Sequence, residues 1–168
     1  EVAPEQLGVW MKQRTRWLKG FMLTWLVHMR SPARLLRELG PIGFVGFNSF
    51  LGGIVLSALI HPVFLAFLAY EVATGQFMAP PESILGGTIM MLAVFNLVGG
   101  YISGMAVAAL AASRRGLLRL LPHVVLMPVY WLLISAAAYR AALQLVRDPY
   151  LWEKTPHAPR KTSLHLRR

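Results

Sequence analysis

The chain contains no cysteine, and acidic residues are scarce. Its 168 residues include seven acidic side chains, of which a single one, Asp148, is an aspartate. Without cysteine the chain can form neither a disulfide nor a thiolate metal site. The five histidines are scattered along the sequence with no pair at helical spacing, so we predict no metal site in this chain.

Lysine and arginine are absent from the middle of the chain. All seventeen basic residues lie within the first 37 positions or from position 114 onward. Apolar residues make up 56% of the sequence, whereas soluble domains usually contain about 45–50%. Basic segments that flank apolar blocks follow the positive-inside tendency of membrane proteins. The pattern excludes a soluble nucleic-acid-binding domain and predicts membrane lipid as a partner.

We expect an all-α membrane protein with amphipathic interface helices and two to three transmembrane helices. Residues 1–40 mix aromatic and basic side chains, which predicts cytoplasmic helices at the membrane interface. Residues 41–112 contain two apolar blocks of spanning length, joined by an acidic loop at 71–83 that we place outside. Residues 147–168 form a basic tail that we place in the cytoplasm.

Prolines and glycines mark the expected helix boundaries. Ser31-Pro32 is predicted to separate a first helix from a second, which should end at Gly40-Pro41. The first span is predicted to be one long helix that is either tilted or kinked at His61-Pro62. Gly100 and Gly104 in the second span have the spacing that permits close approach of a neighbouring helix. A smooth wall for a sliding polymer is the alternative interpretation of these glycines.

Two polar residues, Asn48 and His61, lie within the first apolar block. Polar residues inside a membrane span either contact a pore or form hydrogen bonds between helices. We favour the hydrogen-bonding role for both.

The third apolar block, within residues 113–146, admits two interpretations. Its length would allow a third span, but that crossing would place the basic tail outside, against the positive-inside tendency. The block also contains Pro122, Pro128 and the internal Arg140, which interrupt helical hydrogen bonding or bring charge into the membrane. We therefore predict a bent interfacial or re-entrant helix on the cytoplasmic side, with a simple third span as the alternative.

The polar segment Gln13-Arg-Thr-Arg-Trp17 directly precedes the first long apolar stretch. On a helix, Gln13, Arg16 and Trp17 would share one face, while Arg14 would point elsewhere. A guanidinium fork suits a diphosphate oxyanion, and an indole can lie against the apolar face of a sugar ring. The segment therefore predicts a site for a sugar diphosphate beside a membrane.

The spacing Gln-x-x-Arg-Trp before a membrane span resembles the signature of processive family 2 glycosyltransferases, such as cellulose synthase and hyaluronan synthase. The flanking residues Trp10–Gly20 extend the resemblance. It implies that Gln13 and Arg16 bind the nucleotide diphosphate or the acceptor, and that Trp17 stacks on the acceptor sugar. It assigns no catalytic role to Arg14, which fills a variable position.

The end of the chain also resembles bacterial members of this family. The similarity lies in Trp152-Glu-Lys-Thr-Pro-His157. It implies a candidate gating tail in which Trp152, Lys154 and Thr155 would cover the nucleotide. A solvated tail is the alternative, because the residues differ from the cellulose-type loop.

Groups that sugar transfer requires are missing from the sequence. The reaction needs a metal ion for the diphosphate and a carboxylate base for the acceptor hydroxyl, and the chain has no Asp-x-Asp pair. The resemblance implies that these groups, with Mg²⁺ or Mn²⁺, lie in an upstream α/β (GT-A) catalytic domain absent from this chain. The start at Glu1-Val-Ala-Pro4 leads us to expect a fragment that binds no cofactor and is inactive alone.

The expected function is thus the membrane part of a glycosyltransferase. The parent enzyme would polymerise a sugar from a nucleotide-sugar donor and pass the polysaccharide across a bacterial inner membrane. Its partners would be the nucleotide sugar, the growing glycan and the missing N-terminal catalytic domain. The alternative is a small non-enzymatic membrane protein, such as a transporter subunit or scaffold, which would need polar residues organised within its spans.

Overall fold

The computed structural model describes residues 4, 6–81 and 83–153, and this part of the chain is helical and contains no strand. The long helices are α1 (Leu7–His28), α2 (Pro32–Phe47), α3 (Gly53–Ala73), α4 (Ile84–Arg114) and α5 (Met127–Arg147). Shorter elements are η1 (Asn48–Gly52), η2 (Gln76–Met78) and η3 (Leu118–Leu126). The expected all-α class is confirmed for the described residues.

The boundary between α1 and α2 lies where the sequence predicts it. Pro32 is the first residue of α2, where its fixed φ angle and missing N–H do not disturb helical hydrogen bonding. The first helical part of α2 ends at Gly40-Pro41, as predicted, and a second helical part follows after a kink. Gly40 has φ 69° and ψ 173°, and the helix continues from Pro41 to Phe47. Glycine can adopt this positive φ, and a residue before proline is disfavoured in the α region.

A π-helical turn joins α2 to α3 at Asn48–Gly52. Trp25 of α1 packs on this turn, and its Nε1 donates to Asn48 Oδ1 at 3.0 Å. A Cβ at Gly52 would come within 2.9 Å of the Trp25 ring. The hydrogen-bonding role predicted for Asn48 is therefore confirmed. The irregularity of the first apolar block lies at this turn, whereas α3 continues through Pro62.

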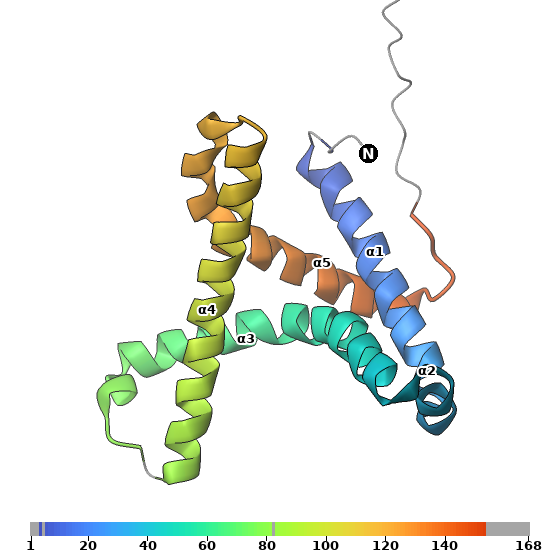
Figure 1. The fold of residues 1–168 in the computed structure, drawn as a ribbon, viewed down its shortest axis with the longest axis horizontal. Coiled ribbons are helices and arrows are strands. Elements are labelled where there is room, and N and C mark those ends of the chain that lie inside the picture. Colours follow the sequence, from blue (N-terminus) through green and yellow to red (C-terminus); the bar gives the residue numbers. More distant parts are fainter. Residues whose placement is uncertain (1–3, 5, 82, 154–168) are drawn as a thin grey trace, which may run out of the picture.

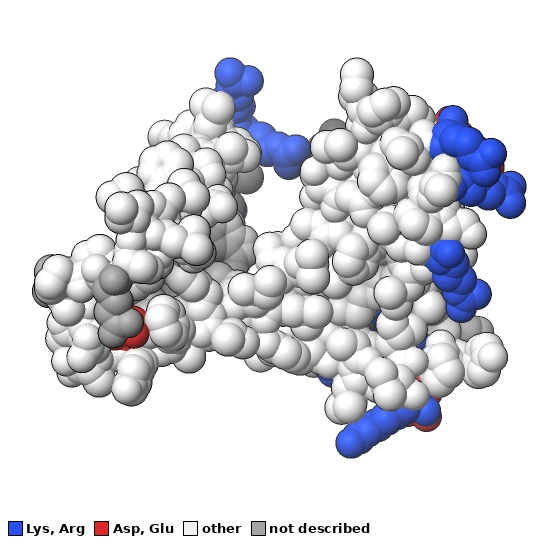
Figure 2. All heavy atoms as spheres, turned by 90° about the horizontal axis from the view of Figure 1, so that it is seen from below, with Lys and Arg blue, Asp and Glu red and all other residues white. Residues whose placement is uncertain are grey.

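Three helical segments are long and apolar enough to cross a membrane: Pro32–Ala73, Ile84–Arg114 and Leu118–Arg147. No residue in the most apolar stretch of α4 is buried, and Phe95 is 75% exposed. Figure 2 shows Lys and Arg at the edges of a broad uncharged surface. Exposed apolar area of this extent is typical of a surface that faces lipid or another protein.

The third apolar block folds in two parts. η3 contains Pro122 and lies beside the end of α4, and α5 runs from there to α1 (Figure 1). The block is therefore not one straight helix. Its position in the membrane, interfacial or spanning, stays a prediction.

The core lies where α1, α3 and α5 meet. Alanines on one face of α5 are fully buried, and small residues let helix backbones approach closely. Because α5 presents this face, α1 can pack directly across it (Figure 1). The buried cluster comprises Leu18, Met22, Val55, Ala58, Ala137, Ala138 and Ala141.

An aromatic cluster connects α3, α4 and α5. His61 Nε2 lies 2.7 Å from the Tyr101 hydroxyl, and Tyr101 stacks on Trp131 with the ring centroids 4.8 Å apart. The predicted helix–helix hydrogen bond of His61 is thus confirmed. A Cβ at Gly104 would come within 2.7 Å of Trp131, whereas a Cβ at Gly100 would meet nothing within 4 Å. Of the two glycines, Gly104 is the one that permits close helix approach.

We predict that Gly104→Ala destabilises the fold and that Gly100→Ala does not. The new methyl group at Gly104 would push against the Trp131 ring, and such overpacking typically costs about 1–3 kcal/mol. At Gly100 the methyl group meets open space, and alanine has the better helix propensity. Thermal unfolding in detergent measures both variants. Equal melting temperatures would contradict the close contact between Gly104 and Trp131.

Candidate functional site on helix α1

Helix α1 carries polar side chains into the packed interior. Gln13 is 7% exposed, Thr15 0% and Lys19 1%. The Thr15 hydroxyl is buried without a hydrogen-bond partner in the described part of the chain. Buried polar groups usually have partners, because a missing one costs about 1–3 kcal/mol. These buried polar side chains are therefore unusual for a helix whose only role is packing.

Lys19 holds the segment that follows α5. Its ammonium group donates to the carbonyl oxygens of Asp148 and Leu151, each at 2.8 Å. Asp148 is the C-cap residue of α5, and the carbonyls at a helix C-terminus lack intrahelical partners and carry partial negative charge. Lys19 thus adds a charged donor to the Asp148 carbonyl, which also accepts from the Leu151 amide, and supplies a donor to the Leu151 carbonyl. A hydrogen bond to a charged group contributes about 1.5–3 kcal/mol.

Arg140 and Glu153 form a second connection to the same segment. The Arg140 guanidinium donates to both carboxylate oxygens of Glu153, at 2.7 and 2.6 Å. Hydrogen bonding from Arg140 holds the pKa of Glu153 below its usual range, and a hydrogen bond from Gln144 and the charge of Lys12 act in the same direction. Partial burial of the carboxylate opposes this lowering. The pair gives the charge inside the third apolar block a specific partner.

Arg16 also faces the segment after α5. Its Nη1 lies 3.5 Å from the Glu153 carbonyl oxygen, and its guanidinium carbon lies 5.9 Å from the centre of the Trp152 ring. Both contacts are long, since N–H···O bonds are usually 2.7–3.2 Å. The structure therefore brings Arg16 together with Trp152 from the candidate gating tail. The other two tail residues, Lys154 and Thr155, lie outside the described residues.

Trp17 lies beside Arg14. The Arg14 guanidinium carbon is 4.5 Å from the centre of the Trp17 ring and 5.7 Å from that of Trp10. Residues three and four positions apart are neighbours on a helix, so Arg14 contacts the indoles on both sides of it. The prediction that Arg14 points away from Trp17 is therefore wrong. A cation–π contact at an exposed site contributes about 0.5–1 kcal/mol.

The three predicted site residues have different surroundings. Gln13 is buried, whereas Arg16 and Trp17 are half-buried. Arg16 contacts the segment after α5, and Trp17 contacts Arg14. Arg16 and Trp17 are therefore both partly accessible, whereas Gln13 is not.

The contacts of three site residues were not predicted from the sequence. These residues are Lys19, Arg140 and Glu153. Lys19 follows Arg16 by three positions, which places it beside Arg16 on the helix. Arg140 is a charge in an apolar helix and needs a carboxylate partner. Glu153 is the first glutamate after it in the sequence. These signals are present in the sequence, but none of them indicates which backbone carbonyls Lys19 binds.

The site offers groups that bind rather than groups that react. Its side chains are guanidinium, ammonium, amide and indole groups, and Glu153 is a weak base because its pKa is lowered. The described residues contain no group of three His, Cys, Asp or Glu side chains able to hold a metal ion. The arrangement suits recognition of an anion and of a flat apolar ring face.

We predict that Lys19→Met releases the segment after α5. The Leu151 amide donates to the Asp148 carbonyl that also accepts from Lys19. Loss of a charge-assisted bond should speed hydrogen exchange at the Leu151 amide by about tenfold or more. The control Arg30→Met changes an exposed cation in the turn after α1 and should leave this rate unchanged. Equal rates in the Lys19 variant and the unmodified chain would contradict the contact.

We predict that the Glu153 carboxylate titrates below the usual glutamate pKa of about 4.3. Its pKa is lowered in the fold, so the ion pair stabilises the fold above the unfolded pKa. This contribution is lost as the pH falls through the lowered pKa. Carbon-detected NMR titration of Glu153 measures the midpoint. Arg140→Gln should move the midpoint upward, and an unchanged midpoint would show that the pair does not form.

No protein-family model, no curated protein and no solved structure matches this chain. What the chain does must therefore be argued from its own residues. The strongest of these observations is that Arg16, Lys19 and Arg140 all contact the segment after α5.

Proposed function

We propose that this chain is the membrane portion of a glycosyltransferase. The whole enzyme polymerises a sugar from a nucleotide-sugar donor and passes the polysaccharide across the inner membrane of a bacterium. Three helices of spanning length support the membrane location. The resemblance of the segment Gln13–Trp17 to the Gln-x-x-Arg-Trp signature supports the reaction class.

The main support for the proposal is the contact between two segments that are far apart in the sequence. The family resemblance singles out two segments, at Gln13–Trp17 and from Trp152 onward, and these segments meet in the fold. Arg16 and Glu153 are 137 positions apart and lie within 3.5 Å, while Arg16 also approaches the Trp152 ring. A gate over a bound donor requires the segment after α5 to reach Arg16, whereas a scaffold protein has no such requirement.

In the proposed site each α1 residue has a separate role. Arg16 binds a diphosphate oxygen of the donor, because its planar fork matches oxyanion geometry. Trp17 stacks on the acceptor sugar, and Arg14 holds the indole from one side. Gln13 is buried and positions its neighbours or reaches the donor once the tail moves.

The segment after α5 acts as the gate. Lys19 and the Arg140–Glu153 pair anchor it close to α5, while its contacts with Arg16 are long and weak. A donor diphosphate can therefore replace the Glu153 carbonyl at Arg16 without breaking the anchor. The family resemblance implies that Lys154 and Thr155, which lie outside the described residues, would donate to the same diphosphate.

The metal ion and the catalytic base belong to the proposed upstream domain. Mg²⁺ or Mn²⁺ there would neutralise the donor diphosphate. This chain supplies binding and orientation of donor and acceptor at the membrane surface.

The purified chain should accordingly transfer no sugar from radiolabelled nucleotide sugars. Specific turnover above background would contradict the proposal.

In the parent enzyme, we predict that Trp17→Ala abolishes polymer formation while nucleotide-sugar binding largely survives. Arg16→Ala should weaken nucleotide binding as well, because a charge-assisted contact contributes about 1.5–3 kcal/mol. Arg14→Ala should lower polymer output to a smaller extent, since it removes a cation–π contact worth about 0.5–1 kcal/mol. Polymer output per inserted enzyme and equilibrium binding of the nucleotide sugar are the two measurements.

The variant Trp17→Phe provides the control for membrane anchoring. An interface anchor would tolerate phenylalanine, and its loss would reduce the amount of inserted enzyme. Acceptor stacking instead predicts reduced polymer output at equal insertion. Normal output per inserted enzyme from Trp17→Ala would exclude the acceptor role and leave the segment with diphosphate binding alone.

Topology provides a further prediction. The positive-inside tendency places α1 and the basic tail in the cytoplasm and the loop before α4 outside. Because the chain has no cysteine, single cysteines can be introduced at Gln76 and Ser163. An impermeant thiol reagent should label position 76 from outside and leave position 163 unlabelled. Outside labelling at position 163 would show that the third apolar block crosses the membrane.

A further inference from the structure

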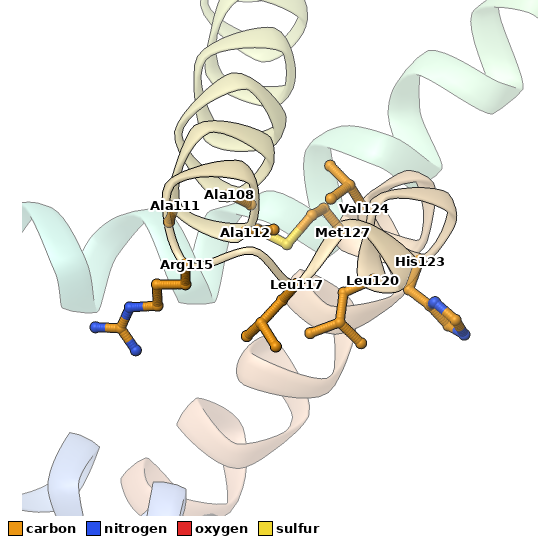
Figure 3. A pocket seen from close by; sticks show the side chains of 9 residues that line it. All are labelled: Ala108, Ala111, Ala112, Arg115, Leu117, Leu120, His123, Val124 and Met127. Atoms are coloured by element: carbon orange, nitrogen blue, oxygen red, sulfur yellow. The ribbon is translucent and has the colours of Figure 1, made fainter.

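A shallow, largely open cavity of about 370 Å³ lies between the end of α4 and η3, away from the site on α1 (Figure 3). One wall consists of Ala108, Ala111 and Ala112, and the other side includes Val124 and Met127. The three alanines are spaced three and four positions apart on α4, so they share one face. Short side chains on this face leave room between the two elements. The cavity is therefore a consequence of the alanine pattern at the end of α4.

The turn after α4 places leucines and a cation at the mouth of the cavity. Gly116 has φ 69°, which reverses the chain so that η3 folds back beside α4 (Figure 1). Figure 3 shows Arg115 and His123 reaching outward from opposite sides, with Leu117 and Leu120 between them. The interior of the cavity is thus apolar and its rim carries positive charge.

The basic residues near this rim form no ion pair within the described part of the chain. Arg114, Arg115 and Arg119 are exposed, and no hydrogen bond or ion pair engages them there. They follow directly on a helix whose most apolar stretch is unburied. Positive charge at the end of an apolar helix lies at the depth of lipid phosphate groups.

We propose that this cavity binds one anionic glycerophospholipid. An acyl chain occupies the space beside Ala108, Ala111 and Met127, and the phosphate contacts the guanidinium of Arg115. Both parts of the ligand are needed, because the lining is apolar apart from Arg115 and His123 at the rim. The exposed apolar surface of α4 continues to the cavity, with Val107 68% and Leu110 53% exposed, so a bilayer lipid can enter from the side.

The test is native mass spectrometry of the full chain in detergent, after incubation with equal amounts of phosphatidylglycerol and phosphatidylcholine. The chain should retain phosphatidylglycerol in preference to phosphatidylcholine. Arg115→Gln should lower retained phosphatidylglycerol by about tenfold, because a charge-assisted contact is lost. Ala111→Leu should lower the retention of both lipids, since the added side chain fills the space of the acyl chain.

Two comparisons separate this site from general attraction. Arg30→Gln removes an exposed cation elsewhere and should leave lipid retention unchanged, and an excess of inorganic phosphate should not displace the lipid. Equal losses in Arg30→Gln and Arg115→Gln would overturn the proposal in favour of surface electrostatics. Displacement by phosphate alone would overturn it in favour of a simple anion site. Equal retention of the two lipids would exclude recognition of the headgroup.

Discussion

The candidate site depends on the hydrogen bonds that the ammonium group of Lys19 donates to backbone carbonyls after α5. The end of α5 leaves backbone carbonyls without helical partners, and in a packed, largely apolar setting such groups need donors. Lys19 reaches from α1 and donates to the carbonyl of the C-cap residue Asp148 and to that of Leu151 in the segment that follows. This contact fixes the direction in which the chain leaves α5, and it brings Glu153 back to Arg140 and Arg16.

Burial of Lys19 is tolerated because the charge is bonded rather than isolated. A buried ammonium group without partners would cost several kcal/mol or more, and here two carbonyl oxygens replace water. Arg140 is stabilised by the same principle, through a bidentate pair with Glu153. The alanine face of α5 allows α1 close enough for these contacts to form. Packing and electrostatics are therefore linked at the crossing of these two helices.

Local sequence signals predicted much of the helical framework. Pro32 starts α2 as expected, and the polar residues Asn48 and His61 join helices. Gly40-Pro41 ends the first helical part of α2 as predicted, because Gly40 adopts a positive φ. The sequence did not indicate that helical geometry resumes directly afterwards. The π turn had no recognisable sequence signal, since it depends on how Trp25 packs from another helix.

The candidate site was predicted only in part for a related reason. Gln13, Arg16 and Trp17 were identified by their spacing, but the position of Arg14 was misjudged because its spacing of three from Trp17 also makes the two residues neighbours. The carbonyls that Lys19 binds could not be predicted. They are backbone groups more than a hundred positions away, and every residue carries the same carbonyl group. The pattern of side chains therefore does not indicate which carbonyls Lys19 contacts. The cavity beside η3 likewise depends on the turn at Gly116.

Photo-crosslinking from position 152 is the most direct test of the central claim, that the segment after α5 docks on α1. A benzophenone amino acid would replace Trp152 in the membrane-inserted chain, and mass spectrometry would locate the linked residues after irradiation. If the segment docks on α1, crosslinks should form to the part of α1 around Arg16. They should be lost when Lys19 is replaced by methionine. Crosslinks confined to lipid, or unchanged by Lys19→Met, would contradict this docking.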